Sequence, residues 1–359
     1  MVFCKACRDS YVEDADEDAN TKLIPGKRGI LFMNVGTPDE PTSQACKKYL
    51  EEFLLDPEVI DIPYPIRQLV VRGLILNTRP QKIAPKYKGV WMDEGSPLRV
   101  YTQRIADSVE SLIPGVICRV GMRYGNPSTE SSLKSLRDAG VDELMIAPLF
   151  PHYAQATTET SFKFAYKWLK KINWQPNIYH LTPFPNDQRY ITSLSESIKR
   201  KLTPDSHLLF SYHGLPMSHI RRAERLGIPK YNEHCESTTN AVVKYLGLNE
   251  SQWTMSYQSR LGPVKWLTPA TDKTIKKLVK KVGIKKLVIV SPAFLADGLE
   301  TLEELDQENR EIFEENGGEE LTVLKCLNAD QDWMKEFSQI ILENFESKPT
   351  KEDRLACLL

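Results

Sequence analysis

The sequence lacks any run of about 18 apolar residues, so it predicts no helix that spans a bilayer. It also lacks an excess of one charge: 47 Lys and Arg stand against 48 Asp and Glu, which leaves no bulk basic field for nucleic acid. With 23 Pro and 18 Gly in 359 residues, it has too little of either for a low-complexity chain. A globular protein with locally placed charged groups remains.

Cysteine is sparse, and no disulfide framework is predicted. The seven cysteines are an odd number spread along the whole chain, which is typical of reduced thiols. Cys4 and Cys7 form the only close pair, which is half of a zinc or iron–sulfur site. Residues 1–20 are acidic and lack the apolar core of a secretory signal, so we expect a cytoplasmic protein. We expect disorder in the acidic tail 1–24 and fraying over 347–359.

Between these tails, short β-branched runs alternate with longer amphipathic segments, the pattern of βαβ units and a parallel sheet. Strands are predicted near 28–35, 116–122, 143–149, 177–181, 207–212, 253–258, 286–291 and 321–326. Helices are predicted over 43–55, 98–112, 187–201, 236–246, 271–282, 299–315 and 331–345. Because one core rarely exceeds roughly 200 residues, we expect an α/β protein of two domains.

In both halves of the sequence, Gly and Pro residues follow the predicted strands in the same order. Strands of the first half end in 34–38, 123–127 and 148–150, and those of the second half end in 212–216, 259–263 and 292–294. Gly and Pro after apolar strands mark tight turns, and ligands of open α/β sheets bind at these carboxyl ends. The pattern predicts a cleft between the halves, with a hinge near 175–185. Its expected lining is Thr37, Arg123, Tyr124, His213, Arg260 and 292–304.

Two features carry candidate chemistry. Of the six histidines, His213 alone directly follows an apolar strand and precedes a Gly-x-Pro turn, although a hydrogen-bonded structural histidine is the alternative. Glu300, Glu304 and Glu308 recur every four residues and share one helix face, which the helix dipole explains only for Glu300. A solvated acidic face is the alternative there. An imidazole and a carboxylate at adjacent strand ends suit a first-row divalent metal such as ferrous iron, and equally a proton-transfer pair.

Phosphate-binding and hydrolase signatures are missing. The sequence has no Gly-x-Gly-x-x-Gly, no Gly-x-x-x-x-Gly-Lys-Ser/Thr and no Gly-x-Ser-x-Gly. Nucleotide enzymes and serine hydrolases are therefore poor fits.

The segment 62–80 is unusual for an early connection. It is apolar from Ile66 onward, with Arg67, Arg72 and Arg79 spaced along it. It is either an ordinary core helix, or an exposed lip that holds a flat anionic ligand or rests in a membrane interface.

Six motifs together are similar to a known family. They are 31–38, 94–98, 121–127, 211–216, 257–263 with Trp266, and 300–304. In this order they resemble the ferrochelatases of bacterial type, enzymes that insert ferrous iron into a porphyrin, over about Gly29 to Phe345.

The resemblance implies two Rossmann-like, chelatase-type domains whose parallel four-stranded sheets face a central cleft. The first would span 25–180 with a porphyrin-binding lip at 62–79, and the second 181–346 with the metal and proton site and a final helix. His213 and Glu300 match the family's catalytic and metal-binding positions. Glu304 and Asp297 match a path for protons or metal. Porphyrin-contacting positions are matched by Arg79, Tyr87, Ser96, Val35, Arg123, Tyr124 and Trp266.

The sequence departs from family patterns in three places. Gly298 stands where some members have His or Cys, so a supplementary ligand is lacking. The C-terminus offers only Cys357 and the loop 153–158 has no cysteine, so we predict no [2Fe-2S] cluster. Val35 replaces a Tyr of some coproporphyrin-using members, which favours protoporphyrin IX.

The resemblance implies a lyase of haem biosynthesis that inserts Fe²⁺ into protoporphyrin IX, forms protohaem and releases two protons. Fe²⁺ is then a substrate, and no resident cofactor and no nucleic acid partner are expected. Peripheral membrane contact through 62–79 is a further expectation. The alternatives are a coproporphyrin III ferrochelatase, a related metal chelatase, and a porphyrin or haem carrier without catalysis.

Overall fold

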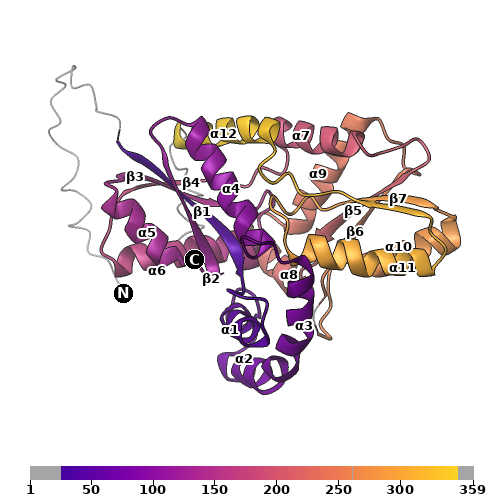
Figure 1. Cartoon of the computed structure of the whole chain (residues 1–359), viewed down its shortest axis with the longest axis horizontal. Coiled ribbons are helices and arrows are strands. Elements are labelled where there is room, and N and C mark those ends of the chain that lie inside the picture. Colours follow the sequence, from indigo (N-terminus) through magenta and orange to yellow (C-terminus); the bar gives the residue numbers. More distant parts are fainter. Residues whose placement is uncertain (1–25, 261, 347–359) are drawn as a thin grey trace.

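The computed structural model describes residues 26–260 and 262–346. It contains two four-stranded parallel sheets with helices packed against both (Figure 1). The first sheet has the order β2-β1-β3-β4 and the second β6-β5-β7-β8. The strands are β1 (Arg28–Thr37), β2 (Ile117–Gly125), β3 (Glu143–Pro148), β4 (Asn177–His180), β5 (His207–His213), β6 (Trp253–Gln258), β7 (Lys286–Val290) and β8 (Glu320–Val323).

The predicted α/β fold and its eight strands are confirmed. In each sheet the second strand in chain order lies at the edge, next to the first strand, and the third and fourth strands follow on the other side. All six strand pairs are parallel. The Gly and Pro residues that follow the strands in the same order in both halves therefore reflect a topology that occurs twice.

The close approach of neighbouring strands explains why glycine occurs at matching places. A Cβ on Gly36, the second-to-last residue of β1, would lie 1.9 Å from the carbonyl oxygen of Tyr124 on β2. A Cβ on Gly214, after β5, would lie 2.7 Å from the carbonyl oxygen of Gln258 on β6. Val35 thus occupies in the first half the position that His213 occupies in the second.

The helices agree with the sequence prediction in part. The α-helices are α1 (Ser43–Leu54), α2 (Tyr64–Val70), α3 (Leu76–Val90), α4 (Pro97–Leu112), α5 (Thr129–Asp138), α6 (Thr160–Lys171), α7 (Gln188–Lys199), α8 (Met217–Leu226), α9 (Tyr231–Leu246), α10 (Thr271–Lys277), α11 (Asn309–Glu315) and α12 (Gln331–Glu346). Four π-helical segments are η2 (Val71–Ile75), η3 (Gln155–Glu159), η4 (Leu278–Val282) and η5 (Glu300–Glu308). Sequence analysis missed α5, α6, α8 and the part of α3 that follows Pro80, and it expected α-helix where η4 and η5 are found.

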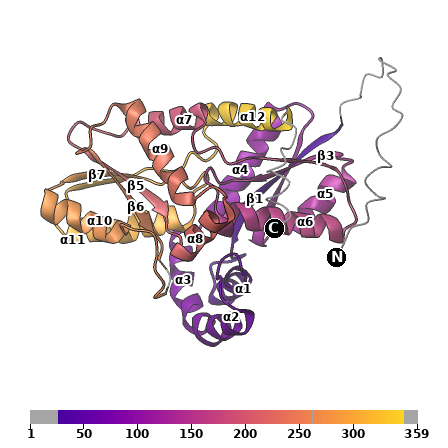
Figure 2. The same ribbon diagram turned by 180° about the vertical axis from the view of Figure 1, so that it is seen from behind.

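The two halves share one hydrophobic core on the side where α4, α7, α9 and α12 lie (Figures 1 and 2). Phe32 of the first sheet and Phe210 of the second belong to this core, together with Trp333 and Phe337 of α12. The rings of Phe32 and Phe337 lie 6.3 Å apart. The final helix therefore packs on both halves, and the segments 1–25 and 347–359 lie outside the described residues. None of the described helices has both the length and the apolarity needed to cross a membrane.

Candidate active site

His213 ends β5 with a defined tautomer. Its Nδ1 lies 2.7 Å from the carbonyl oxygen of Gly214. A carbonyl only accepts, so Nδ1 carries the proton and Nε2 presents a lone pair. Burial lowers the pKa of the imidazole, against the opposing effects of the Glu300 carboxylate and the Gly214 carbonyl. His213 is thus a neutral acceptor near neutral pH, able to take a proton or bind a metal ion at Nε2.

Glu300 begins the π-helix η5, within electrostatic reach of His213. The loop that leads to it follows β7, and its Gly298 leaves room for the carboxylate: a Cβ at this position would lie 3.3 Å from Glu300 Oε2 and 3.7 Å from Leu98. The preceding Leu299 packs against the cluster that Cys46 of α1 forms with Ala84 and Tyr87 of α3. Glu300 of the second half therefore faces helices of the first half.

The acidic row continues along η5 from the half-buried Glu300 and Glu304 to the exposed Glu308. Ser259, held at a φ of 63°, donates to Glu304 from its backbone N–H at 2.8 Å and from its hydroxyl. Burial raises the pKa of Glu304 to about 7 despite these two donors, and the charges of Glu300 and Glu308 act in the same direction. The side chain of Glu308 is 47% exposed. A carboxyl group with a pKa near neutrality thus follows Glu300 in the row, and the exposed Glu308 comes after it.

Lys86 of α3 ties the first half to this row. Its Nζ lies 2.9 Å from Glu303 Oε1 and also pairs with Glu308. Burial raises the pKa of Glu303, which Lys86 opposes. The ion pairs hold α3 against η5.

The residues matched to porphyrin contacts fall into an exposed and a buried group. Arg79 is exposed on α3. Tyr87 and Ser96 are buried, and the Ser96 hydroxyl lies 2.7 Å from that of Thr37. Val35 and Trp266 are half-buried, and Trp266 lies beside Gly214.

Arg123 and Tyr124 form contacts with other residues of the protein. Both contact Asp56, Arg123 through an ion pair and Tyr124 through its hydroxyl at 2.7 Å. Thr160 also donates to Asp56, at 2.7 Å. Arg260, another expected lining residue, pairs with Asp272 at 2.8 Å. A ligand contact by any of these cations stays a prediction.

Asp297 is fully buried and accepts three hydrogen bonds. The donors are the Thr301 hydroxyl at 2.8 Å, the Asn328 amide at 2.7 Å and the backbone N–H of Cys326 at 3.1 Å. These contacts fix the turn before η5, and a place for Asp297 on a proton path stays a prediction.

The described residues contain no group of three or more His, Cys, Asp or Glu side chains placed to hold a metal ion. Metal binding by His213 and Glu300 stays a prediction. The cysteines of the described part, Cys46, Cys118, Cys235 and Cys326, are free thiols, while Cys4, Cys7 and Cys357 lie outside it.

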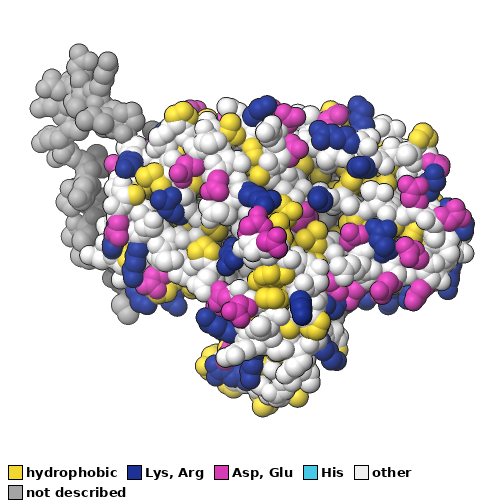
Figure 3. Space-filling model, viewed as in Figure 1, with side chains coloured by type: hydrophobic (Ala, Val, Ile, Leu, Met, Phe, Trp, Pro, Cys, Tyr) yellow, Lys and Arg dark blue, Asp and Glu magenta, His cyan; other side chains and the backbone are white. Residues whose placement is uncertain are grey.

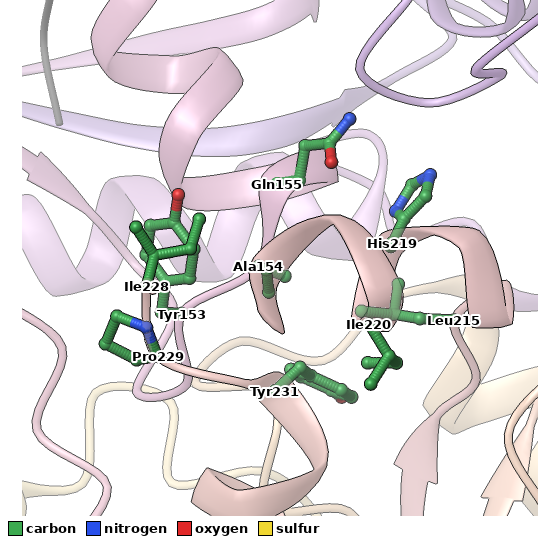
Figure 4. A pocket seen from close by; sticks show the side chains of 10 residues that line it. Tyr153, Ala154, Gln155, Leu215, His219, Ile220, Ile228, Pro229 and Tyr231 are labelled. Carbon is green, nitrogen blue, oxygen red and sulfur yellow. The ribbon is translucent and has the colours of Figure 1, made fainter. Parts of the chain in front are cut away.

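A small cavity lies apart from His213 and Glu300, between the loop before η3 and helices α8 and α9 (Figure 4). It measures about 10 Å³, and Gln155, His219 and Tyr231 are among its lining residues. Both ring nitrogens of His219 are buried without a partner in the described structure. The cavity has room for one water molecule, not for a tetrapyrrole.

Sequence analysis missed four residues that surround the acidic row: Cys46, Tyr49, Lys86 and Ser259. They come from α1, α3 and the turn after β6. Ser259 begins the segment 259–263, one of the Gly- and Pro-containing turns of the internal repeat, so its position could have been noticed. The other three come near this row only through tertiary packing: Lys86 pairs with Glu303 and Glu308, Tyr49 lies within electrostatic reach of Glu300, and Cys46 belongs to the cluster on which Leu299 packs.

The chain was compared with known proteins. The ferrochelatase family model matches residues 27–345. A ferrochelatase of Bdellovibrio bacteriovorus is 39% identical over 332 residues, covering 88% of this chain and 99% of the relative. A ferrochelatase of Haemophilus influenzae is 38% identical over 327 residues, covering 89% and 98%.

Solved structures show the same fold at low identity. SirB from Bacillus subtilis with Fe³⁺ is 11% identical with a TM-score of 0.52, covering 89% of this chain and 95% of that one. The sirohydrochlorin chelatase SirB of the subspecies spizizenii in complex with cobalt is 8% identical with a TM-score of 0.53, covering 89% and 96%. Since the family model and both relatives span nearly the whole described chain, the protein belongs to the ferrochelatase family, lyases that insert a metal ion into a porphyrin.

Proposed function

We propose that this protein inserts Fe²⁺ into protoporphyrin IX to form protohaem, as a step of haem biosynthesis. Two pyrrole protons must leave the ring as the metal enters. His213 accepts pyrrole protons at Nε2 or ligates the iron on one face of the ring, and Glu300 aids metal delivery or proton exit. Glu304 takes protons onward toward the surface.

The observation that carries this proposal is the fixed tautomer of His213 beside the acidic row. The Gly214 carbonyl leaves Nε2 unprotonated, and burial keeps the ring neutral. A general base works best when it is unprotonated at the working pH. Glu304, with a pKa of about 7, can both accept and release a proton there. A carrier that only binds a porphyrin would have no use for this pair.

Steady-state insertion with protoporphyrin IX and coproporphyrin III, side by side under anaerobic conditions, tests the proposal. Loss of porphyrin fluorescence reports metal insertion. We expect kcat/KM to favour protoporphyrin IX, since Val35 leaves an apolar wall where a Tyr hydroxyl would otherwise stand. A preference for coproporphyrin III would show that protoporphyrin IX is not the natural substrate. Porphyrin binding without metal insertion would show that the protein is a carrier and not an enzyme.

We further propose that the lip 62–79 contacts a membrane surface peripherally in the cytoplasm. Tyr64, Ile66, Leu69 and Leu74 are more than half exposed on α2 and η2. Figure 3 shows hydrophobic and basic side chains next to one another on the lobe that these helices form. Apolar side chains flanked by arginines suit an interface with anionic headgroups.

Co-sedimentation with anionic liposomes tests this contact. The Leu69→Ser/Leu74→Ser variant removes two exposed apolar side chains and should sediment less than the unmodified protein. A matched control is Leu112→Ser/Leu226→Ser, which changes two exposed leucines outside the lip. Equal sedimentation of the lip variant and the unmodified protein would end the proposal.

We also propose that the protein has two domains, 25–180 and 181–346. Limited proteolysis should cut first in the connection between β4 and α7 if the two halves are separable units.

We expect no resident cofactor. Purified protein should lack the visible absorption of an iron–sulfur cluster.

A further inference from the structure

Gln258, the last residue of β6, contacts both elements that carry the candidate catalytic side chains. It lies opposite His213 in the parallel register of β5 and β6. Its backbone carbonyl accepts at 2.8 Å from the N–H of Gly214, the residue whose own carbonyl fixes the tautomer of His213. Its side-chain Nε2 donates at 3.4 Å to the backbone carbonyl of Glu300. The side chain is buried, so water does not compete for these contacts.

Two buried hydroxyl groups set the orientation of the Gln258 amide. Ser211 donates to Gln258 Oε1 at 2.6 Å, and the Thr271 hydroxyl lies 2.8 Å from that of Ser211. Because each hydroxyl has one proton, Ser211 donates to Gln258 and accepts from Thr271. The reverse orientation of the amide would place Oε1 against the Glu300 carbonyl, and two acceptors form no hydrogen bond. Nε2 is therefore held toward Glu300.

The residue after Gln258 contacts the same π-helix four residues further on. Ser259 has a φ of 63°, which is uncommon for a residue other than glycine, and it binds the Glu304 carboxylate through its N–H and its hydroxyl. Such a backbone conformation persists where the surrounding structure requires it. The end of β6 is thus joined to η5 at two glutamates of the acidic row, Glu300 and Glu304.

We propose that Gln258 is a positioning residue that sets the place of Glu300 relative to His213. The inference rests on the proposed function, which gives both side chains a part in metal insertion. His213 and Glu300 belong to separate elements, β5 and η5, and Gln258 contacts both. Since a misplacement of about 1 Å can cost on the order of a hundredfold in rate, Gln258 supports turnover without contacting a substrate.

A double-mutant cycle tests whether Gln258 acts through Glu300. Single-turnover Fe²⁺ insertion, with enzyme in excess over protoporphyrin IX, gives the insertion rate of the unmodified protein, Gln258→Met, Glu300→Gln and the double variant. Methionine keeps the length of the side chain and removes both hydrogen bonds. We expect Gln258→Met to slow insertion about tenfold, the effect of about one hydrogen bond, with an unchanged porphyrin dissociation constant. In the Glu300→Gln background, the same substitution should slow insertion less than about twofold.

Two further variants keep the test decisive. Gln155→Met makes the same change at a buried glutamine that lines the small cavity apart from His213 and Glu300, and insertion should keep its rate. Ser211→Ala removes the donor that orients the Gln258 amide. If Gln258→Met fails to fold, Ser211→Ala should show a smaller loss with the same dependence on Glu300.

The results separate this inference from the proposed function. Equal losses in both backgrounds, an insertion rate that Gln258→Met leaves unchanged, or a slower rate explained by weaker porphyrin binding would overturn the inference. If the unmodified protein does not metallate the porphyrin, or if Glu300→Gln inserts iron at the unmodified rate, the proposed function itself fails.

Discussion

Replacing Glu304 by Gln should stabilise the protein at alkaline pH while lowering its activity. Burial raises the pKa of this carboxyl from 4.5 to about 7. Since one pKa unit corresponds to about 1.4 kcal/mol, the folded state disfavours the ionised carboxylate by about 3 kcal/mol. The penalty is absent below pH 4.5, grows as the pH rises toward 7, and is fully present above it.

Glutamine has the same shape and is never ionised. Its amide oxygen can accept from the Ser259 N–H, and its amide N–H can donate to the Ser259 hydroxyl, so the contacts of Glu304 are replaced. Urea unfolding of both proteins between about pH 4.5 and 8.5 measures the difference. We expect Glu304→Gln to gain about 3 kcal/mol in the free energy of unfolding at about pH 8.5 and little at about pH 4.5.

A control separates burial from the loss of one negative charge. Glu315→Gln changes an exposed glutamate on α11, and its effect on stability should be small at every pH. A Glu304→Gln variant that is less stable than the unmodified protein at alkaline pH, or a gain that does not depend on pH, would refute the reasoning. Turnover should fall, but less than for Glu300→Gln, because the proposed function gives Glu300 the part next to the porphyrin and Glu304 the next step of proton transfer.

Two other substitutions probe the surroundings of the site. Gly298→Ala places a Cβ 3.3 Å from Glu300 Oε2, so steady-state assays should show turnover reduced several-fold, with the melting temperature within about 3 °C because the backbone tolerates Ala; unchanged turnover would mean that the exact place of this carboxylate is unimportant. Asp56→Ala leaves Arg123, Tyr124 and Thr160 without their shared acceptor, and urea unfolding should show a loss of about 3 to 5 kcal/mol. A loss below about 1 kcal/mol would show that solvent replaces Asp56.

The fold was predictable where local signals agree. The apolar strands and the Gly and Pro turns after them are local features, and the sheets follow them closely. Helices α5 and α8 were missed because polar side chains such as Ser132 in α5 and His219 in α8 share the buried face with only a few apolar residues, among them Leu133 and Ile220, so the apolar spacing is short. Helix α6 has no side-chain cap and continues directly from η3, so its start carries no sequence signal.

Only those features of the site that depend on residues close together in the sequence could be predicted. His213 stands out because it follows a strand, and the row at Glu300 because its spacing is regular. A π-helix and an α-helix both keep residues four apart near one face, so the pattern could not reveal η5. The engagement of Arg123 with Asp56 joins residues 67 positions apart, which no local pattern encodes.

The central claim is that His213 performs the insertion step rather than holding the porphyrin. Anaerobic Fe²⁺ insertion and porphyrin affinity, measured on the same samples of unmodified protein and His213→Ala, test it directly. A general base contributes about 10²- to 10⁴-fold, so we expect turnover to fall by at least that range while the porphyrin dissociation constant changes little. Near-normal turnover in His213→Ala would contradict the account.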